Sequence, residues 1–166
     1  MTDPSLVECS VRQLHARYVD AVWRKDAETF LDCFTEDGEW KIAGMHLRGH
    51  AEIRSQFDKF MAPCERILMS FGTPLLEVDH NTASSRTLVT ECVKHRDGEV
   101  IRTVGLYYDR FVVQNDRWRF KWRHWSLYYY GPPDFSGPFL DSPEYGAPPG
   151  MPAPDEPTIS RARHKE

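Results

Sequence analysis

The chain has 166 residues, of which 40% are hydrophobic and 28% charged, and its formal net charge is -4. This length allows one domain with a core that needs no metal ion or disulfide to hold it. The negative charge argues against general binding to nucleic acid or anionic lipid. The sequence also contains no run of about 20 apolar residues, which a membrane-spanning helix needs. The opening residues, MTDPSLVECS, lack the basic and apolar regions of a secretory signal, so we expect a cytoplasmic protein.

The cysteines give no sign of a metal site or a disulfide framework. They are far apart in the sequence: Cys9, Cys33, Cys64 and Cys92. Scattered thiols without a C-x-x-C pair are typical of a protein in a reducing compartment. We therefore expect free thiols and no bound zinc.

Three helices are predicted in the first third of the chain. Apolar side chains recur at helical spacing from about residue 5 to residue 25. Asp26 is suited to cap a second, shorter helix that carries Phe30 and Phe34. A break at TEDGE and a short strand or hairpin in WKIAGMHL follow, and a third helix is predicted at about residues 50–61.

After Pro63 the period of the apolar pattern changes from 3.6 to 2. We predict strands at about 66–78, 83–95, 100–113 and 117–130, separated by the turn sequences DHNT, RDGE and QND. Helices followed by an antiparallel meander predict an α+β fold, in which the helices cover one face of a curved sheet.

The end of the chain differs in composition from the rest. From Gly131 onward it holds nine of the twelve prolines and little periodicity, so it cannot form a second core. We predict a domain over residues 1–130 and a proline-rich, extended or disordered tail over residues 131–166. Apolar side chains of the tail are expected to anchor it: Phe135, Phe139, Leu140 and Tyr145.

Four stretches follow one another in a recognisable order: RYVDAVWRKDAETFLDCFTEDGEW, LRGHAEI, TPLLEVDHNTA and DRWRFKWRHW. Together with the order of the elements, they resemble the SnoaL-like branch of the NTF2-like superfamily, the cystatin-like α+β cone. The resemblance covers about residues 6–130 and implies a cone-shaped apolar pocket. It does not imply one reaction, because similar proteins include ketosteroid isomerase, scytalone dehydratase, hexachlorocyclohexane dehydrochlorinase, polyketide cyclases and the β subunits of ring-hydroxylating dioxygenases.

The resemblance accounts for only part of the family's catalytic machinery. Tyr18 matches the first-helix tyrosine that donates a hydrogen bond to the oxyanion in ketosteroid isomerase. The aspartate base of that enzyme matches Ile42 here. The Asp/His dyad of the dehydratase and dehydrochlorinase relatives matches Trp23 and either Met69 or Ser70. Since both halves of the dyad are absent, the reaction has changed or has been lost.

Two other side chains are candidates for acid–base chemistry. Glu91 lies in the strand TLVTECV, where alternation alone leaves open whether it faces the pocket as a desolvated base or faces solvent. His124 and Tyr128 share the alternation of Trp122 if no bulge intervenes, which would place them at the pocket mouth. The catalytic candidates are thus Tyr18, Glu91 and His124. The ligand-binding candidates are aromatic: Trp23, Trp40, Tyr108, Trp122 and Tyr128.

The closing strand, RWRFKWRHW, alternates cations with aromatic rings. The cations are expected on one face: Arg117, Arg119, Lys121 and Arg123. The rings are expected on the other: Trp118, Phe120 and Trp122. A nucleic-acid strand could not touch both faces, so we expect no nucleic-acid binding. The cationic, convex face is expected to be solvated or to form the two-fold interface of a homodimer.

Two functions stay open at this point. The first is a lyase, hydratase or isomerase that needs no cofactor and acts on a small hydrophobic cyclic compound. Tyr18 would then be the hydrogen-bond donor, and Glu91 or His124 the proton carrier. The second is a non-catalytic protein that binds an apolar ligand, or a scaffold subunit similar to a dioxygenase β chain.

Overall fold

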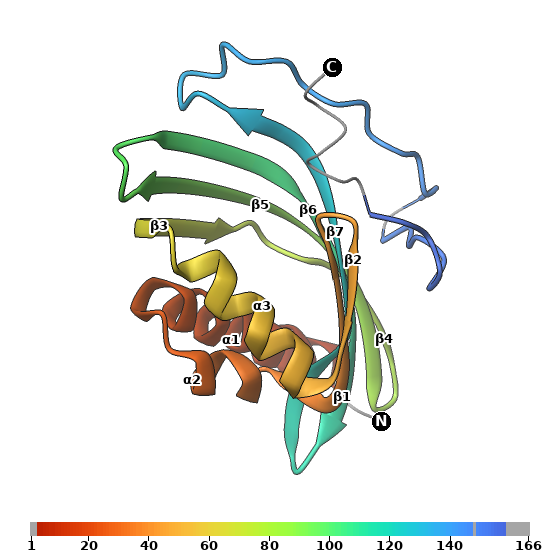
Figure 1. Cartoon of the computed structure of the whole chain (residues 1–166). Helices are drawn as coiled ribbons and strands as arrows, with labels where there is room; N and C mark the ends of the chain where they lie inside the picture. The colour runs from red at the N-terminus through yellow and green to blue at the C-terminus, as the bar shows by residue number, and fades with distance from the viewer. Residues whose placement is uncertain (1–2, 148, 159–166) are drawn as a thin grey trace.

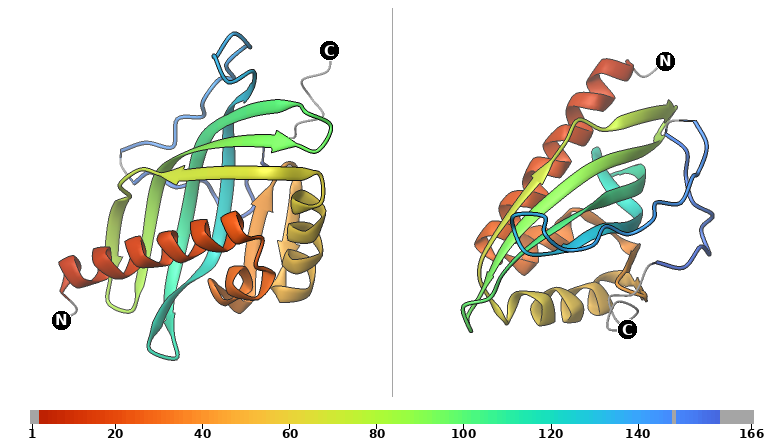
Figure 2. Two further views of the ribbon diagram at one scale, coloured as in Figure 1. Left: turned by 90° about the vertical axis from the view of Figure 1, so that its left-hand side faces the viewer. Right: turned by 90° about the horizontal axis from the view of Figure 1, so that it is seen from above.

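The computed structural model describes residues 3–147 and 149–158. Within these residues the chain forms three helices and seven strands: α1 (Pro4–Arg24), α2 (Ala27–Asp32), β1 (Phe34–Ile42), β2 (Met45–Arg48), α3 (Gly49–Met61), β3 (Cys64–Phe71), β4 (Leu75–Asp79), β5 (Thr82–His95), β6 (Val100–Gln114) and β7 (Arg117–Gly131). The helices lie together on the concave side of a strongly curved sheet (Figure 1). Figure 2 shows the chain after β7 on the side of the sheet away from α1. The predicted α+β architecture is confirmed.

The first two helices begin at residues suited to helix starts. Asp3 accepts a hydrogen bond from a backbone N–H of the first turn of α1 (2.9 Å), and Pro4 occupies a position where no N–H is needed. Lys25 ends α1 in the left-handed conformation, with φ 55°. Asp26 then caps α2, as predicted, by accepting from the N–H of Thr29. Among the described residues, no helix combines the length and the apolar character needed to cross a membrane.

The sheet is mainly antiparallel and continuous. Its strand order is β2-β1-β7-β6-β5-β3, and β4 pairs with the first residues of β5. The last three long strands form the predicted meander, and β1 joins it as the parallel neighbour of β7. Because β5, β6 and β7 are long and bend together, they enclose the space that the helices cover.

Two strand boundaries differ from the predicted ones. The strand expected at about 66–78 is two strands, β3 and β4, because Pro74 between them has no N–H to donate. The break expected at TEDGE is an irregularity within β1, whose register with β7 shifts between Phe34 and Glu39. Gly38 lies in this irregularity, where a Cβ atom would come within 2.9 Å of a backbone carbonyl oxygen.

β7 contains two extra residues relative to β6, Lys121 and Tyr128. Phe111 pairs with Phe120, but Arg110 pairs with Trp122, so Lys121 is left without an opposite residue in β6. An extra residue of this kind is a β-bulge, and the bulge at Lys121 reverses the direction of the side chains that follow it. In the same way, Tyr128 has no opposite residue between Leu127, which pairs with Gly105, and Tyr129, which pairs with Val104, so the register shifts a second time there.

The bulge at Lys121 reverses the alternation of cations and rings that the sequence suggests for β7. Arg123 faces the helices, with its guanidinium carbon 4.4 Å from the ring centre of Tyr18. Trp122 and His124 face the other side of the sheet, where their rings stack with centres 5.6 Å apart. The prediction that Arg123 belongs to an exposed cationic face is therefore wrong. The placement of His124 on the same side as Phe120 is wrong for the same reason.

The other three cations of this strand find partners within the chain. Arg117 and Arg119 both contact the carboxylate of Asp32, at 3.4 and 2.7 Å. Lys121 pairs with Asp37. Each of the three cations thus has a carboxylate partner in the same chain, with Asp32 shared by two of them, and the homodimer through the convex face stays a prediction.

The first half of the tail packs beside the end of β7. Tyr129 forms a β-bridge with Phe139, and the N–H of Leu140 donates to the carbonyl oxygen of Tyr128 (2.8 Å). The ring of Phe135 meets that of Tyr129 edge-on, with centres 5.1 Å apart. The rings that we expected to anchor the tail therefore contact the last strand.

The second half of the tail crosses the convex face toward β1. The ring of Tyr145 meets that of Tyr108 edge-on, with centres 5.2 Å apart. Farther on, the ammonium group of Lys41 donates to the carbonyl oxygens of Pro154 (2.9 Å) and Glu156. Residues 159–166 lie outside the described residues, and the division into domain and tail stays a prediction.

Removal of residues 151–166 should lower the melting temperature, because the Lys41 ammonium, which is buried in the complete chain, would exchange both carbonyl acceptors for water. We expect a loss of about 2 kcal/mol, which is roughly 5 °C for a chain of this size. In a Lys41→Met background the same truncation should cost much less. Differential scanning calorimetry of the four proteins checks this, and an equal loss in both backgrounds would exclude Lys41 as the anchor.

Candidate functional site

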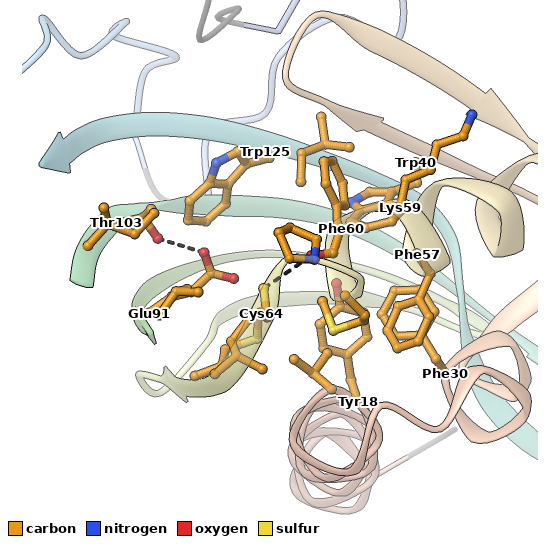
Figure 3. Close-up of a pocket in the computed structure, with 18 of the residues that line it drawn as sticks. Tyr18, Phe30, Trp40, Phe57, Lys59, Phe60, Cys64, Glu91, Thr103 and Trp125 are labelled. Carbon is orange, nitrogen blue, oxygen red and sulfur yellow. Dashed lines mark hydrogen bonds between the residues drawn. The ribbon is translucent and has the colours of Figure 1, made fainter. Parts of the chain in front are cut away.

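A cavity of about 170 Å³ lies between the helices and the concave face of the sheet. Its walls are mainly apolar and aromatic: Phe30, Trp40, Phe57, Ile67, Val93 and Trp125. Figure 3 shows Tyr18 entering this space from α1, with Glu91 and Thr103 on the strands at one side and Phe30 and Phe57 at the other.

Tyr18 lies on the buried stripe of α1, with 1% of its surface exposed. Its hydroxyl oxygen is 3.4 Å from that of Tyr107 on β6, and both residues line the cavity. Burial raises the pKa of Tyr18 well above its ordinary value and raises the pKa of Tyr107 to about 12. Both phenols therefore keep their protons near neutral pH. Two hydroxyl groups that share one hydrogen bond have a second hydrogen left to donate to a ligand.

Glu91 lies in the wall of the same cavity. Its side chain therefore occupies the face of β5 that looks toward the pocket, not the solvent face. The hydroxyl of Thr103 on β6 donates to Glu91 Oε2 at 2.6 Å. Thr103 is itself buried, with 1% exposure. This bond fixes the direction of a partly buried carboxylate that stands among apolar side chains.

A charged pair lies behind the two tyrosines. Arg123 and Asp109 are both fully buried and face each other across β7 and β6. Arg123 donates from Nε to Asp109 Oδ1 (2.7 Å) and from Nη2 to Oδ2 (3.1 Å). His15 of α1 approaches the same carboxylate, with Nε2 3.5 Å from Oδ2. Burial lowers the pKa of His15, so its ring is neutral at pH 7.

The cavity contains three of the residues expected from the sequence: Tyr18, Glu91 and Trp40. The other five candidates do not line it: Trp23, Tyr108, Trp122, His124 and Tyr128. Trp23 is 51% exposed, because it follows Val22 on α1 and points away from the sheet. Tyr107, Thr103 and the buried ion pair were not among the expected site residues.

The four remaining candidates gather on the convex face, under the tail. Tyr108 alternates with Tyr107 along β6 and so points to the opposite side, where its hydroxyl lies 3.4 Å from that of Tyr128. The ring of His124 meets that of Tyr108 edge-on. Burial, together with the charge of Lys41, lowers the pKa of His124 to about 4. These residues form a second aromatic cluster and not a part of the cavity.

The buried, neutral ring of His124 should make stability depend on pH. The unfolded chain takes up a proton below pH 6.5, whereas the folded protein resists protonation of this ring down to about pH 4. Stability is therefore lost as the pH falls through this window. Between pH 7 and pH 5 the loss from this group is about 2 kcal/mol. Urea unfolding should show a smaller loss in His124→Gln, whereas His80→Gln, at an exposed position, should behave as the wild type does. Equal losses in all three proteins would contradict the assignment.

The arrangement offers no cluster suited to a metal ion: in the described part of the chain, no three His, Cys, Asp or Glu side chains gather closely enough. Its central groups are neutral phenol donors and one carboxylate in an apolar space, and Lys59 and His95 also belong to the lining. These groups are able to orient a polar oxygen and to accept a proton.

Solved structures with the same fold have low sequence identity to this chain. A variant of Rv3472, a protein of unknown function from Mycobacterium tuberculosis, is 27% identical with a TM-score of 0.68, over 74% of this chain and 72% of that one. An NTF2-like superfamily protein from Salmonella enterica is 19% identical with a TM-score of 0.70, over 75% and 93%. A LinA-type3 hexachlorocyclohexane dehydrochlorinase from Novosphingobium barchaimii is 13% identical with a TM-score of 0.70, over 83% and 96%.

Sequence comparison points to the same group of proteins. No curated protein matches the chain. The family described as the SnoaL-like domain matches residues 6–124, which is well over half of the chain and spans α1 to β7. The chain therefore belongs to the SnoaL-like family, whose fold it shares with the NTF2-like proteins.

Proposed function

We propose that the protein binds a small, neutral, cyclic compound with a carbonyl or hydroxyl oxygen in the cavity. The observation that carries this proposal is an apolar cavity with two separate polar points, the Tyr18–Tyr107 hydroxyls and the Glu91 carboxylate. Apolar walls favour the hydrophobic body of a ligand, and a few fixed polar groups favour one orientation.

The size of the cavity supports a ligand with one ring. An apolar protein cavity of roughly 150 Å³ holds one benzene molecule. The cavity here, about 170 Å³, is suited to a single substituted ring and is too small for a polycyclic compound without movement of the walls.

The charges near the cavity favour a neutral ligand over an anion. The charge of Arg123 is already balanced by Asp109, and Glu91 adds a negative charge to the wall. The one further cation of the lining, Lys59, directs its ammonium group away from Tyr18 and Glu91 (Figure 3). A carboxylate ligand placed between the tyrosines and Glu91 would leave water and lie beside another carboxylate, which is costly. A ketone, an aldehyde or a phenol avoids this cost.

The catalytic form of this proposal is proton transfer next to a carbonyl group. Glu91 would take a proton from the carbon beside the carbonyl, and the electrons of the broken C–H bond would move to the carbonyl oxygen. Hydrogen bonds from Tyr18 and Tyr107 would stabilise the resulting enolate. Return of the proton to another carbon completes an isomerisation, and loss of a leaving group completes an elimination. Neither reaction needs a cofactor.

One observation favours a non-catalytic alternative. The resemblance places the histidine of the Asp/His dyad at Met69, which lines the cavity, or at Ser70, and it places the aspartate at the exposed Trp23. In this alternative the cavity binds the same class of ligand without converting it, or the chain acts as a scaffold subunit.

Tyr18→Phe should weaken binding of acetophenone about fivefold, because one hydrogen bond of roughly 1 kcal/mol is lost. Tyr108→Phe removes a phenol on the opposite face and should leave the affinity unchanged. Isothermal titration calorimetry measures both. If the wild type binds neither acetophenone nor a simple phenol, the proposed ligand class is wrong.

Glu91→Gln separates the catalytic form from the alternative. In D₂O the wild type should catalyse exchange of the methyl hydrogens of bound acetophenone for deuterium. The variant should still bind the ketone, but its exchange rate should be at least 100-fold lower. Proton NMR follows the exchange. A wild-type rate no higher than that of buffer would support the non-catalytic alternative.

A further inference from the structure

Arg123 occupies a cage of aromatic rings behind the cavity. Its guanidinium carbon lies 3.7 Å from the ring centre of Tyr107 and 4.4 Å from that of Tyr18. Phe120, at 3.9 Å, and Phe71, at 5.4 Å, complete the cage. Two of the four rings thus carry the hydroxyl groups that face the cavity.

Stability alone is a weak explanation for this charge. The pair with Asp109 is fully buried, and no described residue accepts a hydrogen bond from Arg123 Nη1. Burying two charges costs several kcal/mol, and apolar residues in place of such a pair often leave a protein equally stable or more stable. An unsatisfied buried donor adds a further cost. Because Arg123 of this pair contacts the rings of the two cavity tyrosines, we look for its role in the site.

A cation against the face of a phenol changes its hydroxyl group. The positive charge attracts the electrons of the ring and stabilises negative charge that develops on its oxygen. The phenol therefore becomes a stronger hydrogen-bond donor. Burial, the larger effect, raises the pKa of Tyr107, and the charge of Arg123 acts against this rise. Asp109 contacts Nε and Nη2 and so holds the guanidinium plane in place.

We propose that Arg123 is a positioning residue for the Tyr18–Tyr107 donors: held by Asp109, it strengthens their hydrogen bonds to a ligand oxygen without touching the ligand. This inference rests on the proposed function. It adds that the site favours an oxygen that gains negative charge, such as the carbonyl of a ketone that forms an enolate. An ether or an alcohol of the same shape should bind less well.

The test is the infrared stretch of the carbonyl group of bound acetophenone labelled with ¹³C. A stronger donor lowers the frequency of this stretch. In Arg123→Met/Asp109→Leu, which removes both charges at similar volume, the frequency should rise toward its value in an apolar solvent, and Kd should rise roughly threefold to tenfold. Asp109→Asn keeps the cation and removes its counter-charge, so the frequency should fall below the wild-type value.

Arg110→Met is the matched control. Arg110 also stacks on a ring, at 4.8 Å from the centre of Trp122, but on the convex face. The frequency in this variant should equal that of the wild type.

If one of the two charge variants does not fold, the other still tests the proposal, because each variant has its own expected direction of frequency shift. A frequency that is unchanged in a folded charge variant, even with a changed Kd, would show that Arg123 only supports the structure and would overturn the inference. Shifts in the same direction in both variants would overturn it as well. Failure of acetophenone to bind to the wild type is a different result, which refutes the proposed function.

Discussion

The bulge at Lys121 determines what the last strand contributes to each face of the sheet. Before it, Phe120 faces the helices; after it, Arg123 takes that side and His124 the other. Without this single residue, two rings would line the helix side and the arginine would point toward the tail. Three features depend on this change of register: the position of Trp125 in the cavity wall, the buried ion pair and the aromatic cluster under the tail.

The two faces of the sheet consequently have different chemistry. On the concave side, three polar side chains at or behind the cavity are each held by a neighbour: Tyr18 by Tyr107, Glu91 by Thr103 and Arg123 by Asp109. On the convex side, the tail covers His124 and Tyr108, and Lys41 is bonded to its carbonyl oxygens. The tail thus shields a part of the face that the sequence suggested for a homodimer, which stays a prediction.

The sequence was sufficient for features that depend on local periodicity. Helical spacing placed Tyr18 on the buried stripe of α1, and the turn sequences placed the meander. Features that depend on register between distant strands were not predictable in the same way. Alternation alone does not tell which of Tyr107 and Tyr108 faces the helices. Along β7, the bulges at Lys121 and Tyr128 each reverse the alternation. One signal was available: Asp109 stands between aromatic residues in the middle of a strand, where a carboxylate needs a cationic partner.

A crystal structure with acetophenone would show whether the cavity binds a one-ring carbonyl compound through the tyrosine pair. We expect the ring between Phe57 and Trp125, and the carbonyl oxygen about 2.7 Å from the hydroxyl oxygen of Tyr18 or Tyr107. Acetophenone bound only under the tail beside Tyr108, or a ring in the cavity with its oxygen turned away from both tyrosines, would show that the tyrosine pair is not the binding site.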